Sequence, residues 1–283
     1  MKFHLIRCVA LSPLLFPLLL PSAYADSITL GTASGYVVLA GSTVTNTGTT
    51  LLTGNLGISP GCALTGAGTM TVTGTTNICN ANALKAQKDL TTAYIQAQSL
   101  KPTGSLTGTD LGGLTLKSGV YSFTSSADLA TGDTLTLEGK LGALFVFQIG
   151  SSLTTGSASS VIFINSLTGK PMSDPNIFWQ VGSSATLGTS TAFEGNILAL
   201  TSITLNTGAS ITCGSALAQN GAVTLQGNSI GGCPAVGGGG GGGGTTVPEP
   251  GTMGLLGTGM LIVAGTARWR LRVRPNGVKG WGA

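Results

Sequence analysis

Residues 193–230 read FEGNILALTSITLNTGASITCGSALAQNGAVTLQGNSI, and this stretch decides the fold class. Apolar residues recur at every sixth position here, in a series that already starts at Leu187 and runs through Phe193, Ala199, Leu205, Ile211 and Leu217. Alternate residues around them are often apolar as well, and a period of two is typical of a strand with one buried face. An apolar residue at every sixth position therefore predicts short strands that each end in a turn.

Three such strands make one coil of the chain. Leu187 to Leu205 is 18 positions, and Leu205 to Leu225 is 20. A coil this short cannot bury its own apolar face, so it has to stack on similar coils, as in a β-solenoid. We therefore predict a mainly β protein, a three-sided (triangular) β-solenoid with one long α-helix packed alongside.

The first side of the predicted coil is apolar at nearly every residue, which indicates that both of its faces are buried. Examples are ALFVFQI (143–149) and NIFWQV (176–181). The covering element is a helix predicted at 82–100, because small and apolar residues fall there on one stripe. Asn80 or Asn82 can cap it, and Lys101-Pro102 ends it. We expect this helix to lie against the side that contains Phe145, Phe147, Ile177, Trp179, Ile197 and Leu198.

The second side is rich in serine and threonine, as in SATLGT (184–189) and SITLNT (202–207). If its leucines point inward, their neighbours point outward. The inward set is then Leu153, Leu187, Leu205 and Leu225, and the residues before them are Ser152, Thr186, Thr204 and Thr224. Two positions earlier stand Gly150, Ser184, Ser202 and Ala222. Neighbouring strands lie roughly 4.8 Å apart, so we expect a flat, uncharged grid of hydroxyls and methyls. Ser42-Thr43-Val44-Thr45 has the same character and can extend it.

On the third side, the residues predicted to point inward are Phe193, Ile211 and Ile230. The position of this side also helps to predict how the cysteines pair. Cys8 precedes a predicted cleavage site, which leaves Cys62, Cys79, Cys213 and Cys233, an even set expected to form disulfides in an oxidising compartment. The sequence alone permits three pairings. Cys213 and Cys233 each follow a third-side strand and lie one coil apart, so stacking favours the pairs Cys213–Cys233 and Cys62–Cys79.

The charged residues exclude several functions. The whole chain has a formal charge of +4, but residues 26–246 hold six lysines, no arginine and eight acidic residues, which is a net −2. A surface of this kind does not bind nucleic acid, which needs clustered Lys or Arg. The single histidine is His4, so Ser-His-Asp and Cys-His catalysis and His-dependent zinc sites are excluded. The carboxylate pairs Asp128 with Asp133 and Glu138 with Glu194 remain possible, although solvated turn residues explain them more simply. We expect neither an enzyme nor a metal or cofactor site.

Both ends of the chain carry export signals. Lys2 and Arg7 precede an apolar stretch, and Ala23-Tyr24-Ala25 is a cleavage site, so residues 1–25 are predicted to be a signal peptide. The tail has VPEPG, an apolar run at 252–267 and four arginines up to Arg274. It resembles the PEP-CTERM sorting signal of Gram-negative bacteria. That resemblance implies processing by an exosortase, with transient membrane association through residues 252–267. The predicted segments are therefore 1–25, a domain at 26–233, a glycine-rich linker at 234–246, the sorting signal at 247–274, and a tail at 275–283.

The domain resembles a microbial ice-binding protein family. The resemblance rests on residues 193–230, on YVVLAGSTVTNTGTTLLTGNLGISPG (36–61) and on GVYSFTSSADLATGDTLTLEG (119–139), and it covers about residues 28 to 232. It implies a triangular solenoid with one helix, an N-terminal coil packed among C-terminal ones, and a flat face that adsorbs to ice. That face often has a Thr-small-x-Thr/Asn pattern, which Thr201-Ser202-Ile203-Thr204 matches. The candidate ice-contact residues are Thr43, Thr45, Ser152, Ser184, Thr186, Thr201, Ser202, Thr204, Ala222 and Thr224.

Two other functions are weighed beside ice binding. Outward threonine is common on any exposed sheet, so the chain can also be a secreted structural or adhesive solenoid that binds polysaccharide or matrix. A β-helical polysaccharide lyase fits less well, because no Arg, Lys or Asp cluster is visible in the domain. In each case we expect a monomer that is secreted or retained in the cell envelope or extracellular matrix after processing.

Overall fold

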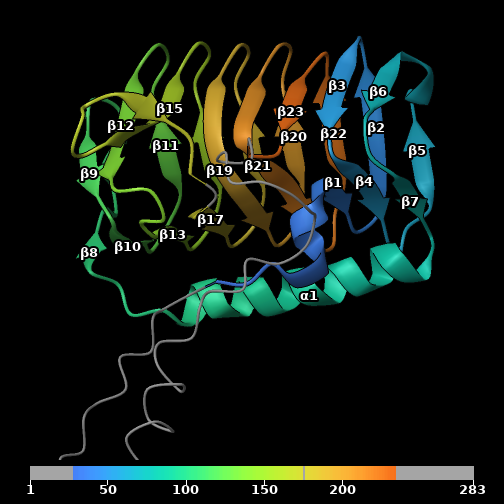
Figure 1. Ribbon diagram of the computed structural model, residues 1–283, viewed down its shortest axis with the longest axis horizontal. Coiled ribbons are helices and arrows are strands. Elements are labelled where there is room, and N and C mark those ends of the chain that lie inside the picture. Colours follow the sequence, from blue (N-terminus) through green and yellow to red (C-terminus); the bar gives the residue numbers. More distant parts are fainter. Residues whose placement is uncertain (1–27, 175, 234–283) are drawn as a thin grey trace, which may run out of the picture. The chain divides into compact units, whose positions relative to one another are not determined.

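The computed structural model describes residues 28–174 and 176–233 (Figure 1). The predicted signal peptide, glycine-rich linker, sorting signal and C-terminal tail lie outside the described residues. Within these residues the protein is mainly β, with one α-helix, as predicted. No helix among them is long and apolar enough to cross a membrane.

Successive passes of the chain pair in parallel and build three ladders of strands. The first ladder lies beside the helix and consists of β8 (Gly104–Ser105), β10 (Gly119–Phe123), β13 (Phe145–Ile149), β17 (Ile177–Val181), β19 (Ala192–Ala199), β21 (Ser210–Ala218), β1 (Tyr36–Ala40), β4 (Asn55–Ile58) and β7 (Thr76–Ile78). The second is a separate seven-stranded sheet: β11 (Ala127–Leu129), β14 (Leu153–Thr155), β18 (Ala185–Leu187), β20 (Ile203–Leu205), β22 (Val223–Gln226), β2 (Thr43–Thr47) and β5 (Ala63–Thr65).

The third ladder shares two long strands with the first. It consists of β9 (Thr115–Lys117), β12 (Thr134–Gly139), β15 (Ser160–Asn165), the first parts of β19 and β21, then β23 (Ser229–Gly231), β3 (Thr50–Thr53) and β6 (Met70–Val72). A bulge in β21 at Cys213, which has a φ of 52°, divides each long strand between the two ladders. Short 3₁₀ helices stand at Gly31–Gly35 and Ala67–Thr69.

The coil length follows the predicted period in one region and departs from it in another. Ala185 pairs with Ile203 and Ile203 pairs with Val223, so the coil repeats in steps of 18 and 20 along the chain. Leu153, however, pairs with Ala185, a step of 32. The longer coil contains residues 165–175, where β16 (Pro171–Met172) folds back antiparallel on β15. The predicted alignment of Leu153 with Leu187 is therefore wrong, because Leu153 aligns with Ala185 instead.

The two ends of the described chain meet in the middle of the stack. β1 pairs with β21, β2 with β22 and β3 with β23, so the N-terminal coil packs directly on the last C-terminal coil, as the family resemblance implied. The ends of the stack are made instead by internal segments, β8 with β9 on one side and β5 to β7 on the other (Figure 1).

Helix α1 (Ala81–Ser99) runs along the first ladder (Figure 1) and starts and ends one residue before the predicted bounds. Asn80 is its cap, because its side-chain oxygen accepts a hydrogen bond from the Ala83 amide at 2.9 Å. The small stripe residues Ala86, Ala93 and Ala97 are buried and allow the helix to approach the sheet closely.

The helix lies against the predicted side of the coil, since α1 contacts β13 and β17, which hold four of the six residues named from the sequence. Leu198 does pack in the cluster under α1, together with Tyr36, Leu39, Val120, Val146, Phe178 and Leu217. The other five residues named for this side belong to the core between the ladders: Phe145, Phe147, Ile177, Trp179 and Ile197. Side chains alternate between the two faces of a strand, so the residue next to each inward aromatic is the one that meets the helix. The rings of Phe147 and Trp179 stack inside this core with centroids 3.9 Å apart.

Candidate functional site

The seven-stranded sheet presents a single column of threonines on its outer face. One threonine from each of six consecutive strands lies in register: Thr154, Thr186, Thr204, Thr224, Thr45 and Thr65. Their neighbours along the strands, such as Ile203 and Leu205, are fully buried. With neighbouring strands roughly 4.8 Å apart, the column is about 24 Å long. We call this surface the threonine face.

The hydroxyls of this column are free of intramolecular hydrogen bonds within the described residues, whereas those of the neighbouring column are not. Ser184 accepts a hydrogen bond from the Ser202 amide at 3.3 Å, and Ser202 accepts one from the Ala222 amide at 3.2 Å. The serines therefore connect one coil to the next, and the threonines keep their hydroxyls for the solvent side. β-branched threonine is also restricted at χ1, so the hydroxyl and methyl positions are fixed in advance.

Most of the predicted contact residues lie together on this sheet, with two corrections. Thr186, Thr204, Thr224 and Thr45 share the column, as predicted from the sequence. Ser152 does not, because Leu153 pairs with Ala185, which places Ser152 next to Ser184 in the neighbouring column. That column also holds Ser184, Ser202 and Ala222, with Thr43 at its far end in register with Ala63. Thr201 is exposed in the turn before β20 and belongs to neither column.

Two column members, Thr154 and Thr65, were not predicted. Thr154 was missed because Leu153 was aligned with Leu187, whereas the pairing of Leu153 with Ala185 puts Thr154 in register with Thr186. Thr65 lies in the short edge strand β5, whose residues Ala63 and Thr65 are exposed and show no strong apolar pattern.

A charge bounds the threonine face at one edge. Asp128 of β11 is in register with Thr154 and exposed, and it accepts a hydrogen bond from the Ser126 hydroxyl at 3.2 Å. The expected grid without charge is therefore correct from β14 to β5 but ends at β11.

Close contact between coils keeps the face regular at its corner. Gly41 and Gly61 each begin a pass toward the seven-stranded sheet, and their amides bond to Gly221 and Gly41 oxygens at 3.0 and 2.8 Å. A Cβ atom at Gly41 would overlap the backbone of Gln219, and one at Gly61 would overlap that of Ser42. At these two positions, therefore, only glycine fits against the neighbouring backbone.

Glu138 and Glu194 do not form the carboxylate pair considered from the sequence. Glu138 is in an ion pair with Lys117, and β15 lies between its strand and that of Glu194. Glu194 is instead buried beside Asp174, whose amide donates to the Glu194 carboxylate at 3.0 Å. Burial raises the pKa of Glu194 to about 7, and the neighbouring Asp174 charge adds to the rise. Within residues 28–174 and 176–233, no group of three or more His, Cys, Asp or Glu side chains is arranged to hold a metal ion.

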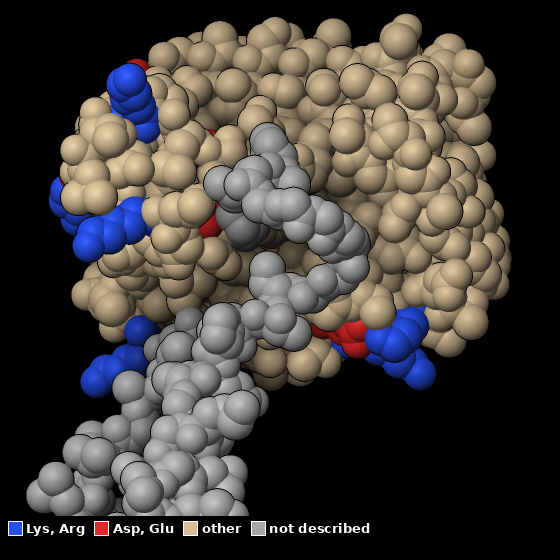
Figure 2. Space-filling view, viewed as in Figure 1, with Lys and Arg blue, Asp and Glu red and all other residues tan. Residues whose placement is uncertain are grey.

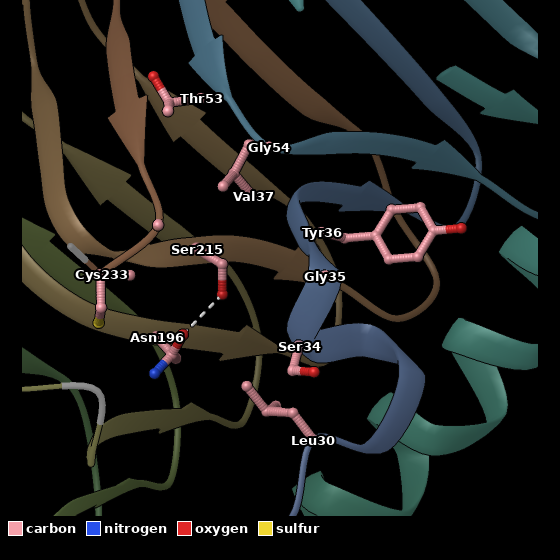
Figure 3. A pocket seen from close by; sticks show the side chains of 12 residues that line it. Leu30, Ser34, Gly35, Tyr36, Val37, Thr53, Gly54, Asn196, Ser215 and Cys233 are labelled. Atoms are coloured by element: carbon pink, nitrogen blue, oxygen red, sulfur yellow. Dashed lines mark hydrogen bonds between the residues drawn. The ribbon is translucent and has the colours of Figure 1, made fainter. Parts of the chain in front are cut away.

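A hollow of about 350 Å³ opens at the corner between the first and third ladders (Figure 3). Its lining includes Tyr36, Val37 and Asn196, and the hydroxyl of Ser215 donates to Asn196 at 2.9 Å. The lining has no carboxylate, lysine or histidine, so it offers no acid–base pair for catalysis. Burial raises the pKa of Tyr36 further above its usual range.

Both predicted disulfides are present. Cys213 is bonded to Cys233, with Cα atoms 3.7 Å apart, and Cys62 is bonded to Cys79, with Cα atoms 5.2 Å apart. The first links the last coil to its neighbour, and the second links the β4–β5 turn to the residue after β7. Each bond ties together successive coils.

Stacked parallel strands, one flanking helix and a flat uncharged face define a class of repetitive β-protein. Comparisons with known proteins identify the group within that class. The ice-binding-like family matches residues 38–231, and the PEP-CTERM protein-sorting motif matches residues 246–272. The chain therefore belongs to the ice-binding-like family.

Individual relatives agree with this assignment. An ice-binding protein of Nostoc sp. (strain HG1) is 48% identical over 92% of this chain and 91% of its own length. One from Colwellia sp. is 34% identical over 76% of this chain and 91% of its own. Among solved structures, an ice-binding protein from an Antarctic biological consortium shares 39% identity, with a TM-score of 0.66 over 81% of this chain and 96% of its own. That of Antarctomyces psychrotrophicus shares 36%, with a TM-score of 0.65 over 72% and 97%.

Proposed function

We propose that this is a secreted ice-binding protein that adsorbs to ice through its threonine face. The single observation that carries the proposal is the register of six outward threonines on consecutive strands, all with uncommitted hydroxyls among the described residues. The names of the relatives and the family match support the same function.

Ice and liquid water are the same molecule, so a protein distinguishes them by geometry. A regular array of rigid side chains can match a lattice at many points without ordering itself on binding. Charged groups would retain their own hydration and disturb that match, and the column from Thr154 to Thr65 has none. Each contact is weak, and adsorption results from their sum along about 24 Å.

The architecture that we propose to support this face is a three-sided solenoid. The three parallel ladders, the regular steps from β18 to β20 and from β20 to β22, and the shared strands β19 and β21 support that geometry. Inward aromatic residues make the frame stiff, since the ring of Trp179 contacts those of Phe147 and Phe193 in its core.

We propose further that the protein acts as a monomer and without catalysis, metal or cofactor. The sorting motif implies secretion or cell-surface export and processing by an exosortase. Transient membrane association through residues 252–267, before that processing, belongs to the same proposal.

The test is a pair of matched variants on a cold stage. Thr204 is half-buried in the middle of the column, so Thr204→Tyr places a bulky ring on the flat surface. Thr212→Tyr is the control, because Thr212 is exposed on β21 in the third ladder. We expect wild-type protein and Thr212→Tyr to shape ice crystals and slow recrystallisation, and Thr204→Tyr to lose most of that activity without a change in melting temperature.

Equal activity of the two variants contradicts the assignment of the face. A wild-type protein that neither shapes nor slows ice crystals contradicts ice binding itself. In that case, retention on polysaccharide in a pull-down assay supports the adhesive alternative, and the threonines are an ordinary solvated surface.

A further inference from the structure

Half of the lysines of the domain lie where the first and third ladders meet. Six lysines and no arginine occur between residues 28 and 233, and three of the six, Lys117, Lys140 and Lys170, belong to β9, the β12–β13 turn and the β15–β16 hairpin. Figure 2 shows lysine side chains at the end of the molecule that carries β8, β9 and β12, while most of this face has no charged side chain.

Backbone contacts hold these segments together. The Ser166 amide donates to the Gly139 oxygen at 2.8 Å, next to Lys140, and the Asn165 amide donates to the Lys170 oxygen at 2.9 Å. Lys117, Lys140 and Ser166 line a common hollow of about 460 Å³.

The charges that face solvent at this place are mainly positive. Glu138 is the acidic residue in the lining of the hollow and pairs with Lys117, so the three lysines and one glutamate leave a local charge of +2. Asp174 also contacts the β12–β13 turn, where its carboxylate accepts a hydrogen bond from the Gly142 amide. That carboxylate is fully buried, so it does not present a negative charge at the surface.

Large apolar side chains are exposed within the same patch. Leu167, at the tip of the β15–β16 hairpin, is 75% exposed, and Leu141, beside Lys140, is 46% exposed. Lysine next to exposed leucine is the composition of surfaces that rest on anionic bilayers: the cation approaches the headgroups and the apolar side chain enters the interface. An anionic polysaccharide would use the lysines but would leave the leucines in water.

The patch also lies on the side of the coil where the chain leaves the domain. Cys233, the last described residue, is bonded to Cys213, at the bulge that joins the third ladder to the first. Residues 234–251 then separate the domain from the apolar run that starts at Thr252. Eighteen residues span at most about 60 Å even when fully extended, so membrane insertion of that run keeps the domain close to the lipid surface.

We propose that Lys117, Lys140, Leu141, Leu167 and Lys170 form a docking surface for an anionic lipid bilayer. We call it the basic corner. The seven-stranded sheet does not border this corner, so a domain docked through it leaves the threonine face uncovered. The inference goes beyond ice binding and does not depend on it.

The experiment measures binding of residues 26–235 to vesicles. The described residues bury their own core and contain both disulfides, so the domain can be studied without the tail. The probes are vesicles of phosphatidylcholine alone and vesicles in which roughly one third is phosphatidylglycerol. We expect binding to the anionic vesicles only, and binding that weakens as salt is added.

Three variants separate the basic corner from general charge. Lys140→Glu with Lys170→Glu should weaken binding roughly tenfold or more, and Leu141→Ser with Leu167→Ser should weaken it at unchanged charge. The control, Lys88→Glu with Lys101→Glu, changes two exposed lysines of the helix region by the same amount and should bind nearly as well as wild type.

Equal losses in the corner and control variants overturn the proposal, because they indicate a non-specific charge effect. It is also overturned if the domain binds both vesicle types equally, or if it binds an anionic polysaccharide but not the vesicles. Melting temperatures close to that of wild type show that the corner variants are folded, whether or not the protein binds ice.

Discussion

Glu194 makes the stability of the domain depend on pH in an unusual direction. The side chain is 5% exposed and lies beside Asp174, and its pKa is raised from 4.5 to about 7. A carboxyl group whose pKa is higher in the folded state than in the unfolded state contributes its full stabilisation of the fold at pH values below the unfolded-state pKa. That stability is lost as the pH rises through the folded value. The domain should therefore be most stable near pH 4.5 and become less stable between about pH 5 and pH 8.

The size of the effect follows from the shift. A rise of the pKa from 4.5 to about 7 corresponds to about 3 kcal/mol of unfolding free energy. For a domain of this size, about 3 kcal/mol lowers the melting temperature by roughly 6–12 °C. The described residues include no histidine, which is the side chain whose ordinary pKa lies in this window.

Denaturant unfolding of residues 26–235 from pH 4 to pH 9 tests this expectation. The side chain in Glu194→Gln still has an oxygen that can accept a hydrogen bond from the Asp174 amide, but it cannot ionise. The stability of this variant should therefore be nearly constant over that range. Glu138→Gln is the matched control, because Glu138 is a partly exposed carboxylate paired with Lys117. Wild-type stability that is constant or rises from pH 5 to pH 8, or a pH dependence that survives in Glu194→Gln, refutes the reasoning.

The other predictions concern the face, the core and the disulfides. Asp128→Thr should extend the threonine column by one strand and strengthen recrystallisation inhibition, whereas Lys88→Thr, which removes a charge from the helix, should not. Trp179→Ala should lower the unfolding free energy by about 3–5 kcal/mol, because the ring is fully buried between Phe147 and Phe193, and a loss below about 1 kcal/mol would show that this core is loosely packed. Replacing Cys213 and Cys233 together by alanine should cost about 3 kcal/mol in denaturant unfolding, and unchanged stability would mean that this bond does not constrain the unfolded chain.

The repeat explains why much of the fold was predictable. The apolar residue at every sixth position from Leu187 to Leu217 predicted the two regular coils, although β19 and β21 continue without a turn from the third ladder into the first. The one segment with a helical stripe became α1, and the position of the cysteines after Ile211 and Ile230 predicted their pairing. Each of these signals is local in the sequence. The apolar pattern also recurs in successive coils, so a single sequence contains it several times.

What was missed depends on choices that apolar periodicity does not encode. Val146 and Phe147 are both apolar, so the pattern cannot say which of them meets the helix and which enters the core. Leu153 was aligned with Leu187 because both are leucines, but it pairs with Ala185, which takes Ser152 out of the predicted column and puts Thr154 into it. The contact of Glu194 with Asp174 depends on how the insertion at 165–175 folds back, and no sequence motif predicts it.

The junction of the two chain ends has a consequence for how the protein is made. Val38 of β1 pairs with Ala216 of β21, so strands from opposite ends of the described chain become direct neighbours. During synthesis and export, the first coil is produced before its neighbour exists, and closing so long a loop slows folding. In the finished stack, by contrast, the two outermost layers are formed by segments from the interior of the sequence. Local opening at either end of the stack therefore frees no chain end that a protease could bind. The arrangement thus makes assembly slow and exposes little of the finished domain to digestion from its ends.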